Sequence, residues 1–305
     1  IENPASGYLQ SCNSTPFYTT DEGNPSIGDF PSYMGEDWKE DKRRSKVSRR
    51  LLREMRNITF EEFEKKAFDT TVYWALVQLP RLRREFQKLK ETHPDLAAKA
   101  APYFEHFDGW DYRMEHDSTQ GSLCLAWYWE LYGTGYPGET IKSKFRKEPH
   151  LKFQALIDAA AALKKFHNDW KVPYGKIHRL QRHADVADFY QIPFDDKLPS
   201  VPCVGAPGPL GVVFTVYYTP SIVVPFVRRM RNHYAIVGTS YLSVVEFGDK
   251  IRARSALPYG ASANPESPHF DDQAKLFSER RLKPAYFYWD DVMKHARKVY
   301  HPGEK

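Results

Sequence analysis

The pattern of apolar residues changes near residue 170, and this change constrains the fold more than any other feature of the sequence. After it, segments rich in β-branched and aromatic residues are separated by turn signals such as Pro220, Asn232 and Gly248-Asp249. Before it, apolar residues recur at helical spacing over 59–80, 94–104, 118–132 and 151–170. The sequence therefore predicts the mixed class α/β (α+β), with a mostly helical first half and an antiparallel, strand-rich second half.

The expected elements can be placed more closely in both halves. Thr59 and Glu62 form a capping-box pattern, so we expect a helix from Thr59 to Pro80 and a second, charged helix to about Lys90. An antiparallel meander is expected over 212–218, 221–229, 234–238, 241–247 and 251–257, and a C-terminal helix over 289–299. The chain is thus divided into an N-terminal strand and loop (1–38), a helical region (39–170) and a strand-rich region (171–305).

Composition excludes several classes of protein. The 305 residues are 41% apolar and 15% aromatic, so the chain can bury a core and is not a disordered protein. It has no apolar run of membrane-spanning length, and its net charge of +5 is too small to require a polyanionic partner. Cys12, Cys124 and Cys203 lack metal-ligand spacing. One disulfide with one free thiol and three buried thiols are both consistent with this number.

The segment 39–56 is strongly basic, and Val47, Leu51 and Leu52 keep helical spacing through it. Two interpretations are open. The segment could be a nucleic-acid patch, or a solvated helix face with one or two arginines turned inward as structural anchors. The modest net charge of the whole chain favours the second.

Turn-forming residues surround a short apolar stretch near the start of the chain. Asn3-Pro4 followed by Ser6-Gly7 is typical of a turn, because proline presets φ and glycine supplies a positive φ. Alternation over Tyr8–Cys12 predicts a short strand that ends at Asn13. Such a strand can hold the Asn13 carboxamide as a donor directed into a site. Spacing alone favours a plainer role for Asn13, as the cap of the turn that follows.

Other candidates for chemistry are few, since the chain has no serine-hydrolase elbow, zinc-protease motif or phosphate loop. Glu246 lies in an expected strand, where it is either paired or on the solvated face of an edge strand. His269 stands near two carboxylates that could orient a base or tie down a loop. Asp21, Glu22 and Asp29 could offer oxygen ligands to a hard cation, but without the spacing of a calcium loop.

A set of short blocks, taken in order, carries more information than any single motif. The blocks are Asn3-Pro4…Gly7-Tyr8…Asn13…Pro16, the arginine-rich helix ending Leu51-Leu52, Gly109-Trp110-Asp111, Val172-Pro173-Tyr174-Gly175…His178-Arg179, and Tyr259-Gly260-Ala261-Ser262…Pro265…Ser267-Pro268-His269-Phe270…Asp272-Gln273. This ordered set resembles the large subunit of the penicillin acylase family. That family of N-terminal-nucleophile hydrolases includes acyl-homoserine-lactone, lipopeptide and cephalosporin acylases.

The resemblance implies a four-layer αββα fold and a precursor that cleaves itself to free an N-terminal serine. The α-amino group of that serine is the base for its own hydroxyl, which attacks an amide carbonyl to form an acyl-enzyme. Asn13 matches the family's side-chain donor to the oxyanion. Arg44, or Arg43 one residue away, matches the arginine that orients this asparagine and the nucleophile's amine. Glu246 matches a carboxylate that supports a histidine near the nucleophile in cephalosporin-type acylases.

The resemblance also implies partners. The chain begins at Ile1 rather than at serine, so we expect it to be the C-terminal part of a large subunit, with the nucleophile and the small subunit on other chains. No cofactor is required, and a structural calcium is a further expectation with Asp21 as its candidate ligand. No nucleic acid and no membrane span are expected.

The expected substrate is an N-acyl amide of the homoserine-lactone, lipopeptide or β-lactam type, and the many aromatic residues favour a hydrophobic acyl chain. The expected location is periplasmic or secreted. The alternative is a non-catalytic scaffold or binding subunit of such an assembly.

Overall fold

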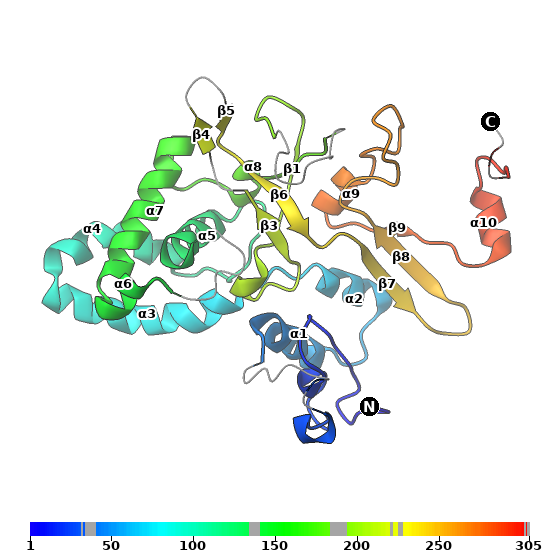
Figure 1. Ribbon diagram of the computed structural model, residues 1–305, viewed down its shortest axis with the longest axis horizontal. Coiled ribbons are helices and arrows are strands. Elements are labelled where there is room, and N and C mark those ends of the chain that lie inside the picture. The colour runs from blue at the N-terminus through cyan, green and yellow to red at the C-terminus, as the bar shows by residue number, and fades with distance from the viewer. Residues whose placement is uncertain are drawn as a thin grey trace. The chain divides into compact units, whose positions relative to one another are not determined.

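The computed structural model describes residues 1–31, 33, 41–133, 141–183, 194–219, 222–224, 228–301 and 303. The chain divides into two compact units, which we call the first unit (Ile1–Asn57 with Phe68–Thr239) and the second unit (Ile58–Ala67 with Ser240–Lys305). These units follow packing contacts, whereas the three regions drawn from the sequence follow the change in secondary structure. Helices and antiparallel sheets are both present, so the predicted α+β class is confirmed (Figure 1).

The first unit contains most of the helices. Helix α5 lies centrally, with α3, α4 and α7 around it (Figure 1). The helices are α1 (Arg43–Glu54), α3 (Tyr73–Thr92), α4 (Pro94–Phe104), α5 (Thr119–Tyr132), α6 (Ser143–Lys147), α7 (Leu151–His167) and α8 (Tyr174–Ile177), with 3-10 turns η1 (Pro16–Tyr18), η2 (Ile27–Asp29), η3 (Glu105–Phe107) and η4 (Gly208–Leu210).

An aromatic core joins these helices. Trp74 of α3 meets Trp127 of α5 edge-on, with ring centroids 5.9 Å apart. Phe104 of α4 lies 4.7 Å from Phe86 of α3 and 5.5 Å from Phe153 of α7. All five rings are buried, and burying one such side chain contributes on the order of 1.5–3 kcal/mol. Packing of these rings therefore fixes the helical layer.

The expected helix from Thr59 to Pro80 is two helices. The capping box is present, since Glu62 N donates to Thr59 Oγ1 over 3.2 Å and Thr59 N donates to Glu62 Oε2 over 2.8 Å. Helix α2 (Phe60–Ala67) nevertheless ends before residue 68, because the chain that follows bonds elsewhere. Val72 N donates to Tyr112 O over 2.8 Å.

The expected break at Pro80 is also wrong, since α3 continues through that residue. A proline inside a helix removes one backbone hydrogen bond. Trp74, Leu79 and Leu82 are buried along the same helix, and their packing offsets that loss.

The sheet of the first unit departs from the expected meander. Its strand order is β2-β1-β6-β3, and β1 pairs with β6 in parallel. His178 and His233 are directly paired there, and their rings stack at 5.0 Å, which joins two strands distant in sequence. The strands are β1 (His178–Leu180), β2 (Val201–Pro202), β3 (Val216–Tyr218) and β6 (His233–Gly238).

One predicted strand, 221–229, is partly outside the described residues, which omit 220–221 and 225–227. Its described parts belong to two strands that pair antiparallel, β4 (Ile222–Val224) and β5 (Arg228–Met230). Residues 222–224 and 228–230 therefore form two paired strands rather than one continuous strand.

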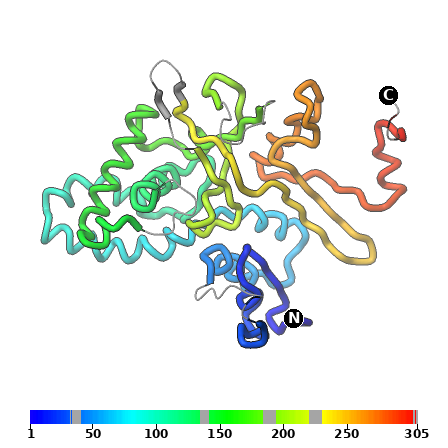
Figure 2. Tube along the Cα trace, viewed as in Figure 1, coloured from blue at the N-terminus to red at the C-terminus, as the bar shows by residue number. Residues whose placement is uncertain are grey.

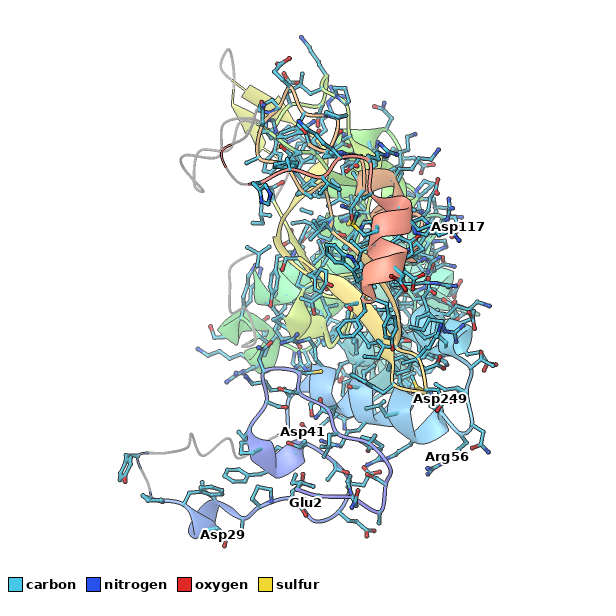
Figure 3. The ribbon with its side chains drawn as sticks, turned by 90° about the vertical axis from the view of Figure 1, so that its right-hand side faces the viewer. Glu2, Asp29, Asp41, Arg56, Asp117 and Asp249 are labelled. Atoms are coloured by element: carbon cyan, nitrogen blue, oxygen red, sulfur yellow. The ribbon has the colours of Figure 1, made fainter. Side chains whose placement is uncertain are left out.

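The second unit is a small sheet with short helices. Strands β7 (Leu242–Glu246) and β8 (Arg252–Ala256) form the antiparallel hairpin that the sequence predicts, and Asp249 lies at its tip (Figure 3). The chain path in Figure 2 continues through α9 (Ala274–Ser278) and β9 (Lys283–Pro284), which pairs with β8, to α10 (Trp289–His295). The C-terminal helix is thus present, but shorter than expected.

Cys12, Cys124 and Cys203 are free and buried, which decides between the two alternatives left open by the sequence. Within the described ranges, no helix is long and apolar enough to cross a membrane.

Candidate active site

The N-terminal segment leads to Asn13 without forming the predicted strand. The turn over Asn3–Gly7 is present, with φ of 75° at Gly7. Residues 8–12 belong to no strand, so that prediction is wrong. A strand needs a row of backbone hydrogen bonds to a neighbour. Among the described residues this segment makes one, from Gln10 N to Thr19 O over 2.9 Å.

Side chains fix the segment to α1 instead. Buried Gln10 donates from Nε2 to Oγ of Ser45 over 2.8 Å and to the carbonyl oxygen of Tyr18 over 2.6 Å. Cys12 is also buried. Asn13 follows with φ of 56°, in the left-handed region that asparagine tolerates better than most residues. The turn chemistry therefore sets the backbone from which the Asn13 carboxamide projects.

Two cationic side chains bind the region of Asn13. Arg44 Nη2 donates to Asn13 Oδ1 over 2.6 Å and to Cys12 O over 3.0 Å. Lys42 Nζ donates to Asn13 O over 2.6 Å. A guanidinium has no acceptor, so the carboxamide must present its oxygen to Arg44. The NH₂ group of Asn13 makes no hydrogen bond within the described residues, and both its hydrogens remain available for donation.

The geometry distinguishes Arg44 from Arg43. Arg43 Nη1 donates to the carbonyl oxygen of Pro209, over 2.5 Å, and so ties α1 to η4. Gly208 lies against Arg44, because a Cβ at that position would be 3.4 Å from Arg44 Nε and 2.9 Å from Tyr217 Oη. Arg44 is thus the arginine that contacts Asn13, and its catalytic role stays a prediction.

Lys42 was not among the predicted site residues. It stands at the N-cap position of α1, two residues before Arg44. This position is the only sequence feature that could have indicated a contact with Asn13, because an N-cap residue lies close to any segment that packs on the start of the helix.

The remaining arginines of α1 are held by carboxylates. Arg49 pairs with Asp41, which Figure 3 labels beside the helix, and its side chain is only 13% exposed. Arg53 binds both oxygens of Asp21, at 2.8 and 2.9 Å from Nε. Arg49 is therefore turned inward, and Arg53 is paired with a carboxylate. Both observations match the interpretation of segment 39–56 as a solvated helix face with arginines as structural anchors.

The Asp21 carboxylate does not suit a cation in this arrangement. Its hydrogen bonds with Arg53 lower its pKa to about 2, and Arg49 adds positive charge nearby. Among the described residues no cluster of three His, Cys, Asp or Glu is arranged for a metal ion. Calcium at Asp21 stays a prediction.

Glu246 lies in the second unit, at the end of edge strand β7. It is paired across the hairpin with Arg252, whose Nε donates to Glu246 Oε2 over 3.0 Å, and its side chain is 48% exposed. This is the solvated edge position that the sequence left open. Its support of a histidine on another chain stays a prediction.

His269 belongs to a tightly closed loop of the second unit. Its Nδ1 lies 2.8 Å from Asp272 Oδ2 on an exposed surface. Buried Gln273 donates from its backbone N to Tyr259 O over 2.7 Å, and its Oε1 accepts from Leu257 N over 3.1 Å. These contacts agree with the loop-fixing interpretation of the cluster.

Comparison with known proteins places the whole set of blocks in one family. A sequence model described as penicillin amidase matches residues 1–294. The chain belongs to the penicillin amidase family. Asn13, Arg44 and Glu246 all lie within the matched range. The same is true of His269, Asp272 and Gln273 in the loop of the second unit.

A solved structure shows the same fold as this penicillin amidase family chain. It is a thermostable penicillin G acylase from Alcaligenes faecalis, matched with a TM-score of 0.50 and 15% sequence identity. The match covers 98% of this chain and 57% of that one, so the chain spans little more than half the length of its structural relative. At this sequence identity the match is evidence for the fold alone. It agrees with the N-terminal-nucleophile hydrolase fold that the sequence led us to expect.

Proposed function

We propose that this chain is a component of an acylase that hydrolyses the linear amide of an N-acyl substrate. Membership of the penicillin amidase family supports amide hydrolysis in general. The observation that carries the proposal is the carboxamide of Asn13, whose oxygen is bound by Arg44 and whose NH₂ group is left to donate. A fixed donor of this kind is what a tetrahedral oxyanion requires.

The nucleophile in this proposal is the hydroxyl of an N-terminal serine on a partner chain. Its α-amino group takes the hydroxyl proton as the oxygen attacks the amide carbonyl, and the carbonyl oxygen becomes an oxyanion. Asn13 Nδ2 donates a hydrogen bond to that oxyanion. The α-ammonium group gives this proton to the leaving amine as the C–N bond breaks and an acyl-enzyme remains. Water then hydrolyses the acyl-enzyme to release the acid and free the serine hydroxyl.

Arg44 acts in two ways in this scheme. Its hydrogen bond to Oδ1 holds the carboxamide in one orientation, so the donor does not have to reorganise during the reaction. Its positive charge polarises the carboxamide and strengthens the N–H donors. Lys42 supports the backbone of the same residue by binding its carbonyl oxygen. Orientation of the nucleophile's amine by Arg44 is part of the proposal.

The finer assignments are proposals as well. The partner chains are those with the N-terminal serine and the small subunit, and the assembly is periplasmic or secreted. The acyl group is hydrophobic, as in homoserine-lactone, lipopeptide or β-lactam substrates. The aromatic content of the chain, 15% of residues, favours a long acyl chain over a compact one.

Purification with partner chains tests the proposal. Intact masses and N-terminal sequencing of the chains that co-purify should reveal one that begins with serine. The assembly should release p-nitroaniline from an N-acyl p-nitroanilide, and the separated chain should not. Turnover by the separated chain would contradict the division of the site between polypeptides. An inactive assembly without a serine-initiated chain would favour the scaffold alternative.

A further inference from the structure

A pocket of about 320 Å³ opens between α5 and α7 of the first unit. Its walls exist because small residues face one another on the two helices. Ala126 of α5 and Ala159 and Ala162 of α7 leave space that larger side chains would fill. The volume is at the lower end of that of small-molecule sites. The pocket therefore suits a ligand of one or two rings.

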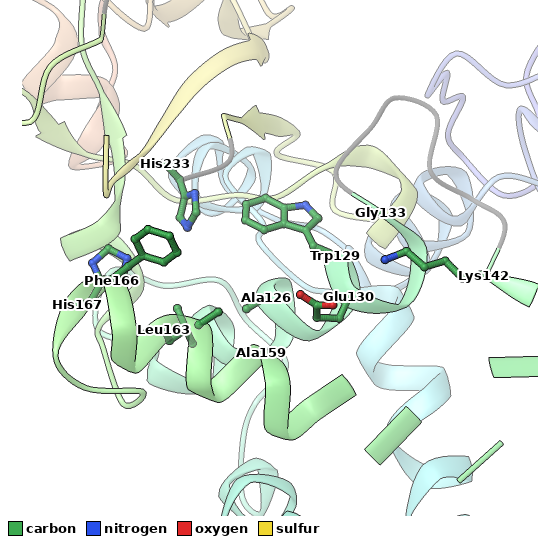
Figure 4. Close-up of a pocket in the computed structure, with 11 residues that line it drawn as sticks. Ala126, Trp129, Glu130, Gly133, Lys142, Ala159, Leu163, Phe166, His167 and His233 are labelled. Carbon is green, nitrogen blue, oxygen red and sulfur yellow. The ribbon is translucent and has the colours of Figure 1, made fainter. Parts of the chain in front are cut away.

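Aromatic and aliphatic side chains form the body of the pocket. Trp129, Leu163 and Phe166 line it, and Figure 4 shows the rings of Trp129, Phe166 and His233 directed into the same space. Trp129 meets His233 edge-on, with ring centroids 4.9 Å apart. Glu130 and Lys142 add one charge of each sign to the lining. An apolar ring fits these walls.

His233 supplies a hydrogen-bond acceptor to this apolar space. The side chain comes from β6 and is only 7% exposed. Its Nδ1 lies 2.9 Å from the carbonyl oxygen of Thr219, which can only accept, so Nδ1 holds the hydrogen. Burial lowers the pKa of His233 to about 4, so the ring is neutral near pH 7. Nε2 then has a free lone pair.

Two further imidazoles adjoin His233, and each has a polar atom without a partner in the described part of the chain. His178, 1% exposed, stacks on His233 at 5.0 Å and binds Tyr174 O through Nδ1. Its Nε2, like the Nε2 of His167 in the pocket wall, is buried with no hydrogen-bond partner among the described residues. An unpartnered buried acceptor costs about 1–3 kcal/mol. These atoms belong to His178 and His167, and they show that hydrogen-bonding capacity beside His233 is unused among the described residues.

We propose that this pocket binds a phenol. The aromatic ring packs against Trp129, Leu163 and Phe166, and the hydroxyl donates to Nε2 of His233. At Nε2 of His233 a carboxylate would meet an acceptor rather than a donor. An ammonium there would be desolvated beside neutral rings, because the charged residues of the lining are only half-buried (Glu130) or exposed (Lys142). A neutral aromatic ring with one hydroxyl can pack against the apolar lining and donate a hydrogen bond to Nε2 of His233.

Binding to the purified protein, with any chains that co-purify, tests the proposal without any need for turnover. The probes are 4-ethylphenol and its methyl ether 4-ethylanisole, in which a methyl group replaces the hydroxyl hydrogen so that the oxygen cannot donate. Titration calorimetry should give a dissociation constant at least about tenfold lower for the phenol, the effect of one hydrogen bond of about 1.4 kcal/mol. Equal affinities, or no binding of the phenol at millimolar concentration, would overturn the proposal.

Two variants on α7 locate the site. Ala162→Trp fills the pocket and should abolish binding of 4-ethylphenol, whereas Ala161→Trp, on the exposed side of the same helix, should leave it unchanged. Circular dichroism checks that both variants fold. Retained binding in Ala162→Trp would place the ligand elsewhere and contradict the proposal. In His233→Phe the preference for the phenol over the ether should disappear.

Discussion

Arg44 Nη2 lies 2.6 Å from Asn13 Oδ1, and this one hydrogen bond determines which way the Asn13 carboxamide faces. An arginine can only donate, so the oxygen of the carboxamide is bound and its NH₂ group is left for another acceptor. A turn cap would use the oxygen to accept from its own backbone instead. The pair therefore has the chemistry of a prepared donor.

Replacing Arg44 should reduce catalysis in the assembled enzyme. Hydrogen bonds to charged groups contribute about 1.5–3 kcal/mol, so Arg44→Ala should lower kcat by about one to two orders of magnitude. Arg43→Ala is the matched control, because Arg43 binds Pro209 O rather than Asn13. Steady-state kinetics with an N-acyl p-nitroanilide measure both. An equal loss of kcat in the two variants would mean that Arg44 acts only on the packing of α1.

A double-mutant cycle separates orientation from independent action. If Arg44 works through Asn13, the loss caused by Arg44→Ala should shrink when Asn13 is already alanine. The same kinetic assay on the two single variants and the double variant gives the coupling energy. Additive losses would show that the two residues contribute separately.

The second unit should be sensitive to Gly260. A Cβ at this position would lie 2.1 Å from the carbonyl oxygen of His269 and 2.6 Å from that of Phe270. Gly260→Ala must therefore displace the loop, at a cost of about 1–3 kcal/mol in the free energy of unfolding. At Gly248 the nearest atom is 3.8 Å away, so Gly248→Ala is the control. Denaturant unfolding measures both, and equal stability of the two variants would refute the close contact.

Stability should decrease in mild acid through His233. Burial holds its folded-state pKa at about 4, below the usual value of about 6.5, so the unfolded chain binds the proton more tightly. This contribution is complete above pH 6.5 and is lost as the pH falls towards 4, by about 3 kcal/mol. His167 and His178 adjoin the ring and also have lowered pKa values, while Asp196 opposes the shift.

Urea unfolding between pH 7.5 and 4 measures this effect. His233→Gln should unfold with a shallower dependence on pH than the wild-type protein. A wild-type slope in that variant would assign the acid sensitivity to other groups.

Local sequence signals predicted the elements whose cause is local. The capping box at Thr59 and Glu62 starts a helix, and Pro94 opens another, because their side chains or ring act within one turn. The hairpin of β7 and β8 follows from alternation and a turn at Gly248-Asp249. These features need no knowledge of distant residues.

Features made by distant residues could not be predicted in this way. The parallel pairing of β1 with β6 depends on His178 and His233, which are far apart in sequence. Segment 8–12 had the alternation of a strand but makes too few backbone hydrogen bonds, so alternation alone misled. The pocket between α5 and α7 depends on alanines of two helices that the sequence does not show to be adjacent.

The candidate site was predicted by ordered blocks rather than by spacing. Asn13 alone resembled a turn cap, and only its place in the ordered set of blocks indicated an oxyanion donor. Sequence alone could not separate Arg44 from Arg43, because both are near the start of α1 and their different partners, Asn13 and Pro209, come from distant segments.

Turnover of the assembled enzyme with Asn13→Ala measures how much the Asn13 carboxamide contributes to catalysis. Asn3→Ala is the control, since Asn3 also has a positive φ, of 43°, and so bears a similar backbone strain on substitution. We expect kcat to fall by about 10²–10³, or about 2.7–4 kcal/mol, in Asn13→Ala and to stay near wild type in Asn3→Ala. A kcat within about threefold of wild type in Asn13→Ala would contradict its role as the oxyanion donor.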